Sequence, residues 1–136
     1  MPKKVRKSNW ALDHINELSK LDINLGTHAS LLLLELISAL NYKNWVTCII
    51  LSATIIDVIN YEESGPILRI VGLDKNSLFS NSETYWLRQK RNSILHYQKP
   101  VSGLMNEKNA SSILEMDAKR SSMILLNILK IIGDEV

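Results

Sequence analysis

Residues 45–59 read Trp-Val-Thr-Cys-Ile-Ile-Leu-Ser-Ala-Thr-Ile-Ile-Asp-Val-Ile, and this stretch decides the fold class. A helix over these residues is apolar on nearly every side, which is typical of a buried central helix or of a membrane span. Fifteen residues are short for a span, and Asp57 interrupts them. They are also long for a strand, despite their β-branched side chains. We therefore predict a buried helix from about Trp45 to Glu62.

Helical patterns continue on both sides of this stretch. The other expected helices span residues 8 or 9 to 21, 28–41, about 81–98 and about 109–132. Thr27 is the expected N-cap of the second helix, and Gly133 the expected end of the last. Between the third and fourth helices we expect a short helical turn over 67–71 and a polar loop over 74–80. Four or five substantial helices with short connections predict an all-α, up-and-down helical bundle.

The composition is that of an ordinary soluble protein, with 46% hydrophobic and 22% charged residues. We predict a single domain over residues 8–136 behind a basic, flexible leader at residues 1–7. An arm that contacts phosphates, or a nuclear-import-like address, is the alternative for this leader. A net charge of +2 is too small to indicate nucleic-acid binding by itself. With no secretory signal at the N-terminus, we expect a cytoplasmic protein that does not bind membranes.

The few candidate metal ligands are scattered. Cys48 is the only cysteine, which excludes an internal disulfide and a cysteine zinc cluster. It lies in an apolar run, so we expect a buried, inert thiol. His14 has no second histidine at i+4, and we expect a surface or packing residue there. We therefore expect neither a metal nor a cofactor.

The richest chemistry lies in residues 86–97, Trp-Leu-Arg-Gln-Lys-Arg-Asn-Ser-Ile-Leu-His-Tyr. We place them in the second half of the helix that opens near Asn81, with Ser80 or Ser82 as its cap and Lys99-Pro100 as its end. Ser80 and Glu83 have the spacing of a capping box. At helical spacing one polar stripe contains Tyr85, Arg88, Asn92 and His96.

Arg91 lies outside this stripe. It precedes His96 by five residues, which places it about 140° around the helix axis, at the edge of the apolar side. A guanidinium there is costly unless a carboxylate or a phosphate meets it. Asp57 also lies among apolar residues, so we predict that Asp57 pairs with Arg91. Glu35, the acid of the second helix, is expected to face solvent.

Arg91-Asn92-Ser93-Ile94-Leu95-His96 resembles the Arg-Asn-x-x-x-His signature of the HEPN domains (higher eukaryotes and prokaryotes nucleotide-binding). The resemblance covers the whole chain and implies an α-helical bundle, usually dimeric, that cleaves RNA without a metal. It assigns Arg91, Asn92 and His96 as catalytic residues, and it implies a toxin or antiviral-defence ribonuclease, with an antitoxin or other protein as a partner. The tyrosine that many toxin-type members carry two residues after the histidine is absent here, where Gln98 holds that place.

These side chains suit RNA cleavage by the adjacent 2′-OH, which leaves a 2′,3′-cyclic phosphate and a 5′-OH. An imidazole such as that of His96 serves as general base or acid near neutral pH. Arg91 would hold the phosphate oxygens, Asn92 would orient the imidazole or bind the phosphate, and Asp57 would support Arg91. Arg88 and Tyr97 are the predicted substrate-binding residues. Because one imidazole does not easily act as both base and acid, we expect a homodimer with the site at its interface.

A structural interpretation of the same residues stays open. Arg91 would extend from the core edge, and His96 would stabilise the helix C-terminus through the helix dipole. The protein would then be a non-catalytic helical module that binds a nucleotide, RNA or a protein partner. The substitution His96→Ala separates the two interpretations.

Overall fold

The computed structural model describes residues 9–62, 75–106 and 108–135. These residues form six helices and no strand, so the all-α prediction is confirmed: α1 (Trp10–Lys20), α2 (Thr27–Asn41), α3 (Trp45–Tyr61), α4 (Lys75–Phe79), α5 (Ser82–Leu95) and α6 (Ala110–Glu135). The predicted leader at 1–7 and the predicted turn at 67–71 lie outside the described residues.

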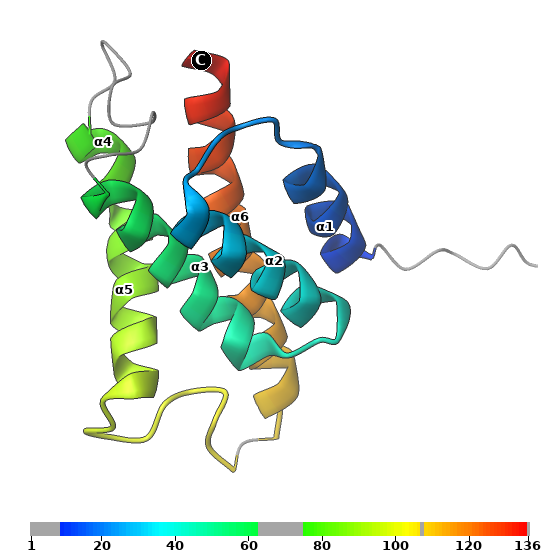
Figure 1. Ribbon diagram of the computed structural model, residues 1–136. Helices are drawn as coiled ribbons and strands as arrows, with labels where there is room; N and C mark the ends of the chain where they lie inside the picture. The colour runs from blue at the N-terminus through cyan, green and yellow to red at the C-terminus, as the bar shows by residue number, and fades with distance from the viewer. Residues whose placement is uncertain (1–8, 63–74, 107, 136) are drawn as a thin grey trace, which may run out of the picture.

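Helix α3 is the centre of the molecule, as its composition predicts. It packs against α2, α6 and α5, and α2 and α3 cross in front of α6 with α5 and α1 on opposite sides (Figure 1). Its buried residues are Cys48, Ile49, Ser52, Ala53, Ile55, Ile56 and Ile59. Cys48 is fully buried, and burial raises the pKa of its thiol to about 12, which fits the predicted inert thiol. Within the described ranges, no helix combines the length and apolar composition that a membrane crossing requires.

The predicted N-cap of α2 is wrong. Thr27 is the first residue of the helix and Gly26 is its N-cap, without a capping hydrogen bond from a side chain. Gly26 adopts a φ of 83°, a conformation that side chains disfavour, and its N–H donates to Oδ1 of Asn24 at 3.0 Å. The chain therefore turns into α2 at the glycine, one residue before the predicted position.

The predicted polar loop before α5 is also wrong, because Lys75–Phe79 form the short helix α4. Leu78 and Phe79 are buried in the core, which is the physical reason for a helix in a stretch that is otherwise polar. Neither serine caps α5. Asn81 is the cap, and it forms a capping box with Thr84, each side chain accepting from the other's backbone N–H at 3.0 Å.

The same asparagine joins α4 to α5. Its side-chain amide donates to the carbonyls of Ser77 and Leu78, the last turn of α4, at 2.9 and 3.3 Å. An asparagine, unlike the predicted serine caps, both accepts from the helix that begins and donates to the helix that ends. This double role fixes where α5 starts, and the start of the helix sets the position of each later residue along its axis.

Two helix ends differ from their predicted positions. Helix α5 ends at Leu95 with His96 as its C-cap, four residues before Pro100. Helix α6 continues to Glu135, so Gly133 lies inside it and does not terminate it. A side chain at position 133 would approach Ile23 to 3.2 Å, which shows that the glycine allows the segment before α2 to pack closely on α6.

Helix α1 is anchored by a buried histidine. Nδ1 of His14 lies 2.6 Å from Oγ of Ser122 on α6, and the His14 ring meets Trp10 edge-on while Trp10 stacks on Trp45. Burial lowers the pKa of His14 and is the largest cause of its shift; Glu17 and Asp13 act against this shift, and Lys119 and Lys130 add to it. Of the two predicted roles, packing is the one that the structure gives this residue.

Candidate active site

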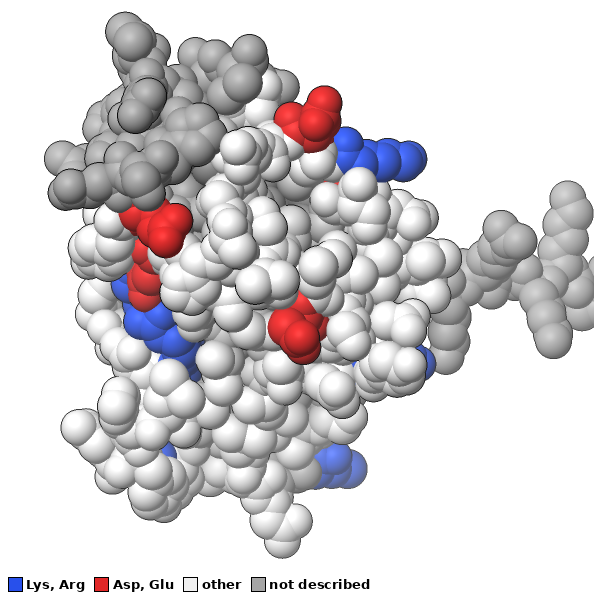
Figure 2. Space-filling model, in the orientation of Figure 1, with Lys and Arg blue, Asp and Glu red and all other residues white. Residues whose placement is uncertain are grey.

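The inner edge of α5 carries an ion-pair cluster that joins it to α3. Nη1 of Arg91 bonds to Oδ2 of Asp57, so the predicted pair is confirmed. Asp57 has a second partner that was not predicted, since Nε of Arg88 lies 3.1 Å from its Oδ1. Nη2 of Arg88 also donates to the carbonyl of Phe79 at 2.8 Å. Acidic and basic side chains adjoin over the border of α3 and α5, whereas the face over α2 carries few charges (Figure 2).

This cluster is partly buried and unequal in charge. The side chains of Asp57 and Arg91 are 23% and 16% exposed, and that of Arg88 is 27% exposed. One carboxylate therefore holds two guanidinium groups, which leaves one positive charge uncompensated within the cluster. A half-buried excess cation raises the local potential and favours the approach of an anion.

The outer side of α5 is different, because here the polar groups face solvent. A hollow of about 360 Å³ is lined by Gln89, Asn92, Ser93, His96, Gln98 and Lys99. Each of these side chains carries a hydrogen-bonding group, one is a cation, and none is a carboxylate. The hollow therefore suits a ligand that is anionic and rich in acceptor groups.

The six-residue motif is divided between these two sides. Asn92 and His96 line the hollow, whereas Arg91 does not and is held by Asp57. Arg91 still reaches Asn92, since its Nε and Nη2 each lie 3.4 Å from Oδ1 of Asn92. The carbonyl side of the Asn92 amide is turned to Arg91, which leaves its NH₂ group to donate into the hollow.

His96 occupies the C-cap of α5. Its backbone N–H donates to the carbonyl of Asn92 at 2.8 Å, which closes the last turn of the helix. The imidazole is exposed, and no described group forms a hydrogen bond with it. A ring in this position has both nitrogens available for a ligand, in contrast to His14, whose Nδ1 is engaged.

The two predicted substrate-binding residues have different positions. Tyr97 follows the helix end and is 73% exposed, so its ring is available for stacking. Arg88 is engaged by Asp57 and by Phe79 and does not line the hollow. Its role in substrate binding stays a prediction.

Sequence reasoning missed four residues of the hollow. Gln89 and Ser93 are adjacent to the predicted polar stripe, and their i,i+4 spacing was a usable signal. Gln98 and Lys99 come after α5 has ended, where no helical period applies. Their positions depend on the path of the chain after His96, which the sequence pattern does not give.

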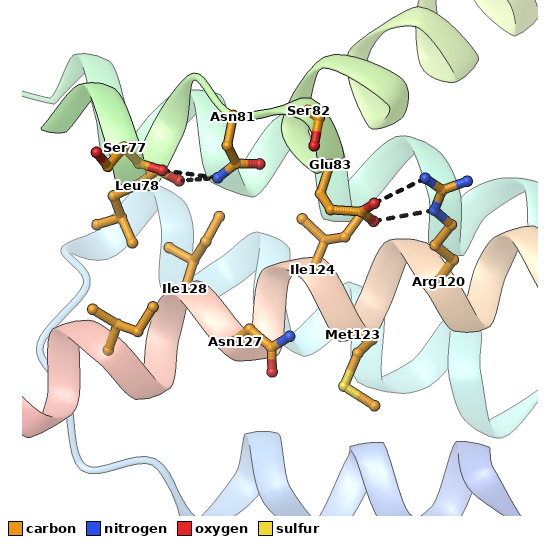
Figure 3. A pocket seen from close by; sticks show the side chains of 11 residues that line it. Ser77, Leu78, Asn81, Ser82, Glu83, Arg120, Met123, Ile124, Asn127 and Ile128 are labelled. Carbon is orange, nitrogen blue, oxygen red and sulfur yellow. Dashed lines mark hydrogen bonds and ion pairs between the residues drawn. The ribbon is translucent and has the colours of Figure 1, made fainter.

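A larger cavity, of about 640 Å³, lies at the opposite end of α5, between α4 and α6. Its walls are mainly apolar, and Ile128 extends from α6 toward Leu78 while Ile124 extends toward Glu83 (Figure 3). At one end Arg120 bonds to both carboxylate oxygens of Glu83, at 3.0 and 3.1 Å. No imidazole lines this cavity, so it lacks the acid–base group that the His96 hollow offers.

Among the residues that the structure describes, no group of three or more histidine, cysteine or acidic side chains is arranged to hold a metal ion. Comparison of the chain with known protein families, with curated proteins and with solved structures gives no match.

Proposed function

We propose that the protein is a metal-independent endoribonuclease of HEPN type, the class that includes toxins and antiviral-defence effectors. The observation that carries the proposal is the shared hollow of Asn92 and His96, with Arg91 in contact with Asn92. An exposed imidazole, an amide donor and a nearby guanidinium are the groups that cleavage of a phosphodiester by its own 2′-OH requires.

In the proposed reaction, the substrate phosphate lies in the hollow near Lys99 and the NH₂ group of Asn92. Neutral His96 removes the proton from the 2′-OH, whose oxygen attacks the phosphorus. The bond to the 5′-oxygen breaks, and this oxygen takes a proton from a second, protonated imidazole to leave a 5′-OH and a 2′,3′-cyclic phosphate. Arg91 contributes positive charge from its position beside Asn92, which stabilises the additional charge of the transition state.

The reaction needs a base and an acid, whereas one hollow contains one imidazole. The other two histidines, His14 and His28, do not line it. We therefore include a second copy of the chain in the proposal: a homodimer of helical-bundle domains with the motif helices at the interface. Light scattering on an active preparation should give the mass of a dimer, and an active monomer at micromolar concentration would contradict this part.

A second candidate function rests on the ion pair of Arg91. Because Asp57 already holds this guanidinium, the motif also fits a purely structural role in which α5 is joined to α3. The protein would then be a non-catalytic helical module that binds a nucleotide, RNA or a protein such as an antitoxin.

The deciding experiment is incubation of the purified protein with total RNA in EDTA. The proposal predicts fragmentation by the wild type and none by Arg91→Ala or His96→Ala. His28→Ala is the matched control, because His28 is an exposed histidine outside the hollow and its loss should change nothing. Cleavage that requires magnesium, or that survives His96→Ala, would refute the mechanism, and absence of cleavage by the wild type would favour the binding module.

A further inference from the structure

A second hollow adjoins the one that contains His96. It has a volume of about 430 Å³, within the usual range for small-molecule sites, about 300–1,000 Å³. Ser93 lines both hollows, so they share a wall. The second one is lined mainly by apolar side chains, including Ile94, Val101, Leu104 and Met105, with Tyr97 at its edge. A polar and an apolar compartment thus lie side by side at the end of α5.

The apolar compartment exposes large hydrophobic side chains next to the polar hollow. Leu104 and Met105 are 48% and 44% exposed, and Tyr97 more so. Exposed apolar side chains beside a polar hollow offer a contact surface for the apolar part of a ligand. It needs an occupant with a flat or apolar part that is attached to an acceptor-rich, anionic part.

The loop that forms this compartment, residues 100–106, is held by contacts with α5 and α6. Nζ of Lys90 donates to the carbonyl of Ser102 at 2.8 Å and also pairs with Asp117 of α6. Gly103 is buried with a φ of 92°, and a side chain there would approach Leu114 to 3.1 Å. The Leu104 N–H donates to the Val101 carbonyl at 2.9 Å and closes a turn. The exposed side chains are therefore presented by a loop that several contacts hold in place.

We infer that the apolar compartment is a nucleobase subsite. This inference rests on the proposed function, in which the polar hollow holds the phosphate. Lys99 supplies charge complementarity to that phosphate, and no carboxylate lines either compartment. The base next to the phosphate then stacks on Tyr97 and packs against Leu104 and Met105. A base in a duplex is stacked between its neighbours and does not reach such a site, so the substrate class is single-stranded RNA with a splayed base.

The test measures binding apart from cleavage. The probe is a short, fluorescein-labelled single strand with 2′-O-methyl groups throughout, which lacks the attacking 2′-OH, and anisotropy gives its dissociation constant. Tyr97→Ala should weaken binding by about 5- to 150-fold, the usual range for loss of one base–aromatic stack. Tyr97→Phe should bind as the wild type does. Tyr85→Ala removes another exposed tyrosine of α5, outside both hollows, and should also leave binding unchanged.

The outcomes separate this inference from the ribonuclease proposal. Tyr97-dependent binding of the single strand, with weaker binding of its duplex, supports the subsite even if RNA is never cleaved. Equal binding by wild type and Tyr97→Ala, or by single strand and duplex, overturns the subsite even if RNA is cleaved at His96. Absence of any nucleic-acid binding also overturns it.

Discussion

The two sides of α5 both carry polar side chains, but those side chains are paired on one side and open to solvent on the other. On the inner side, Arg88 and Arg91 are partly buried and bonded to Asp57. On the outer side, Asn92 and His96 face an open hollow, and the imidazole has no described partner. Adjacent residues of one motif therefore have different tasks: the arginines join the helix to the core, and the outer residues remain available for a ligand.

Two histidines, the buried His14 and the exposed His96, show the same contrast. His14 is enclosed between α1 and α6 with Ser122 as its partner, whereas His96 is exposed at a helix end. Replacement of a packed histidine should change the free energy of unfolding, whereas replacement of a histidine in a ligand site should change activity. The predictions below use this difference, beginning with the largest expected effect.

Replacement of His96 should separate activity from stability completely. We expect His96→Ala to lower the rate of RNA cleavage by about 10²- to 10⁴-fold, the usual contribution of a general acid or base. The melting temperature and the helical circular dichroism should stay nearly unchanged, because the imidazole is exposed and unbonded. A large drop in melting temperature would show that His96 is structural, which would remove the contrast between the two sides.

Replacement of Asp57 should affect stability and activity together. Asp57→Asn leaves two partly buried guanidinium groups without their carboxylate. We expect a loss of about 2 kcal/mol in the free energy of unfolding, a value between those typical of exposed and of fully buried ion pairs. Cleavage should also fall, because Arg91 loses its position. Urea unfolding followed by circular dichroism measures the first effect, and Glu35→Gln, an exposed acid on α2, is the control. Unchanged stability would mean that the cluster does not join α5 to α3.

Acid should destabilise the fold through His14. Burial lowers the pKa of this imidazole in the folded state, so the unfolded chain binds the proton more readily. The contribution of neutral His14 to the free energy of unfolding is fully present above its pKa in the unfolded chain, about 6.5. It is lost as the pH falls from there through the lower pKa of the folded state. Urea unfolding from pH 8 to pH 5 should show this loss, and His14→Gln should reduce it in that window. Identical pH slopes for both proteins would contradict the assignment.

The smallest effect is expected at the start of α5. The Glu83–Arg120 pair is exposed, and the hydrogen bond from Arg120 lowers the pKa of the Glu83 carboxyl. Solvent and salt screen a pair of this kind, so Glu83→Gln should change the melting temperature little and RNA cleavage not at all. A clear loss of activity would show that the cavity between α4 and α6 takes part in cleavage. It would contradict the proposal that the active site is confined to the His96 hollow.

The fold class, the central helix and the Asp57–Arg91 pair were predictable, because each follows from the cost of leaving charge or apolar surface unmatched. Helix ends were less predictable. Asn81 displaced the expected serines because it bonds to two helices at once, and Gly133 lies inside α6, close to Ile23, and does not end the helix. The hollow depends on chain positions after α5, so Gln98 and Lys99 were not expected there.

The most direct test of the central claim is the end-group chemistry of a defined single-stranded RNA incubated with the protein in EDTA. We predict fragments that end in a 2′,3′-cyclic phosphate and begin with a 5′-OH. A single 2′-O-methyl group at the cleaved nucleotide should block the reaction, as should His96→Ala. Fragments with 5′-phosphate ends, or cleavage of the 2′-O-methyl substrate, would contradict the account of the His96 hollow as the site of 2′-OH attack.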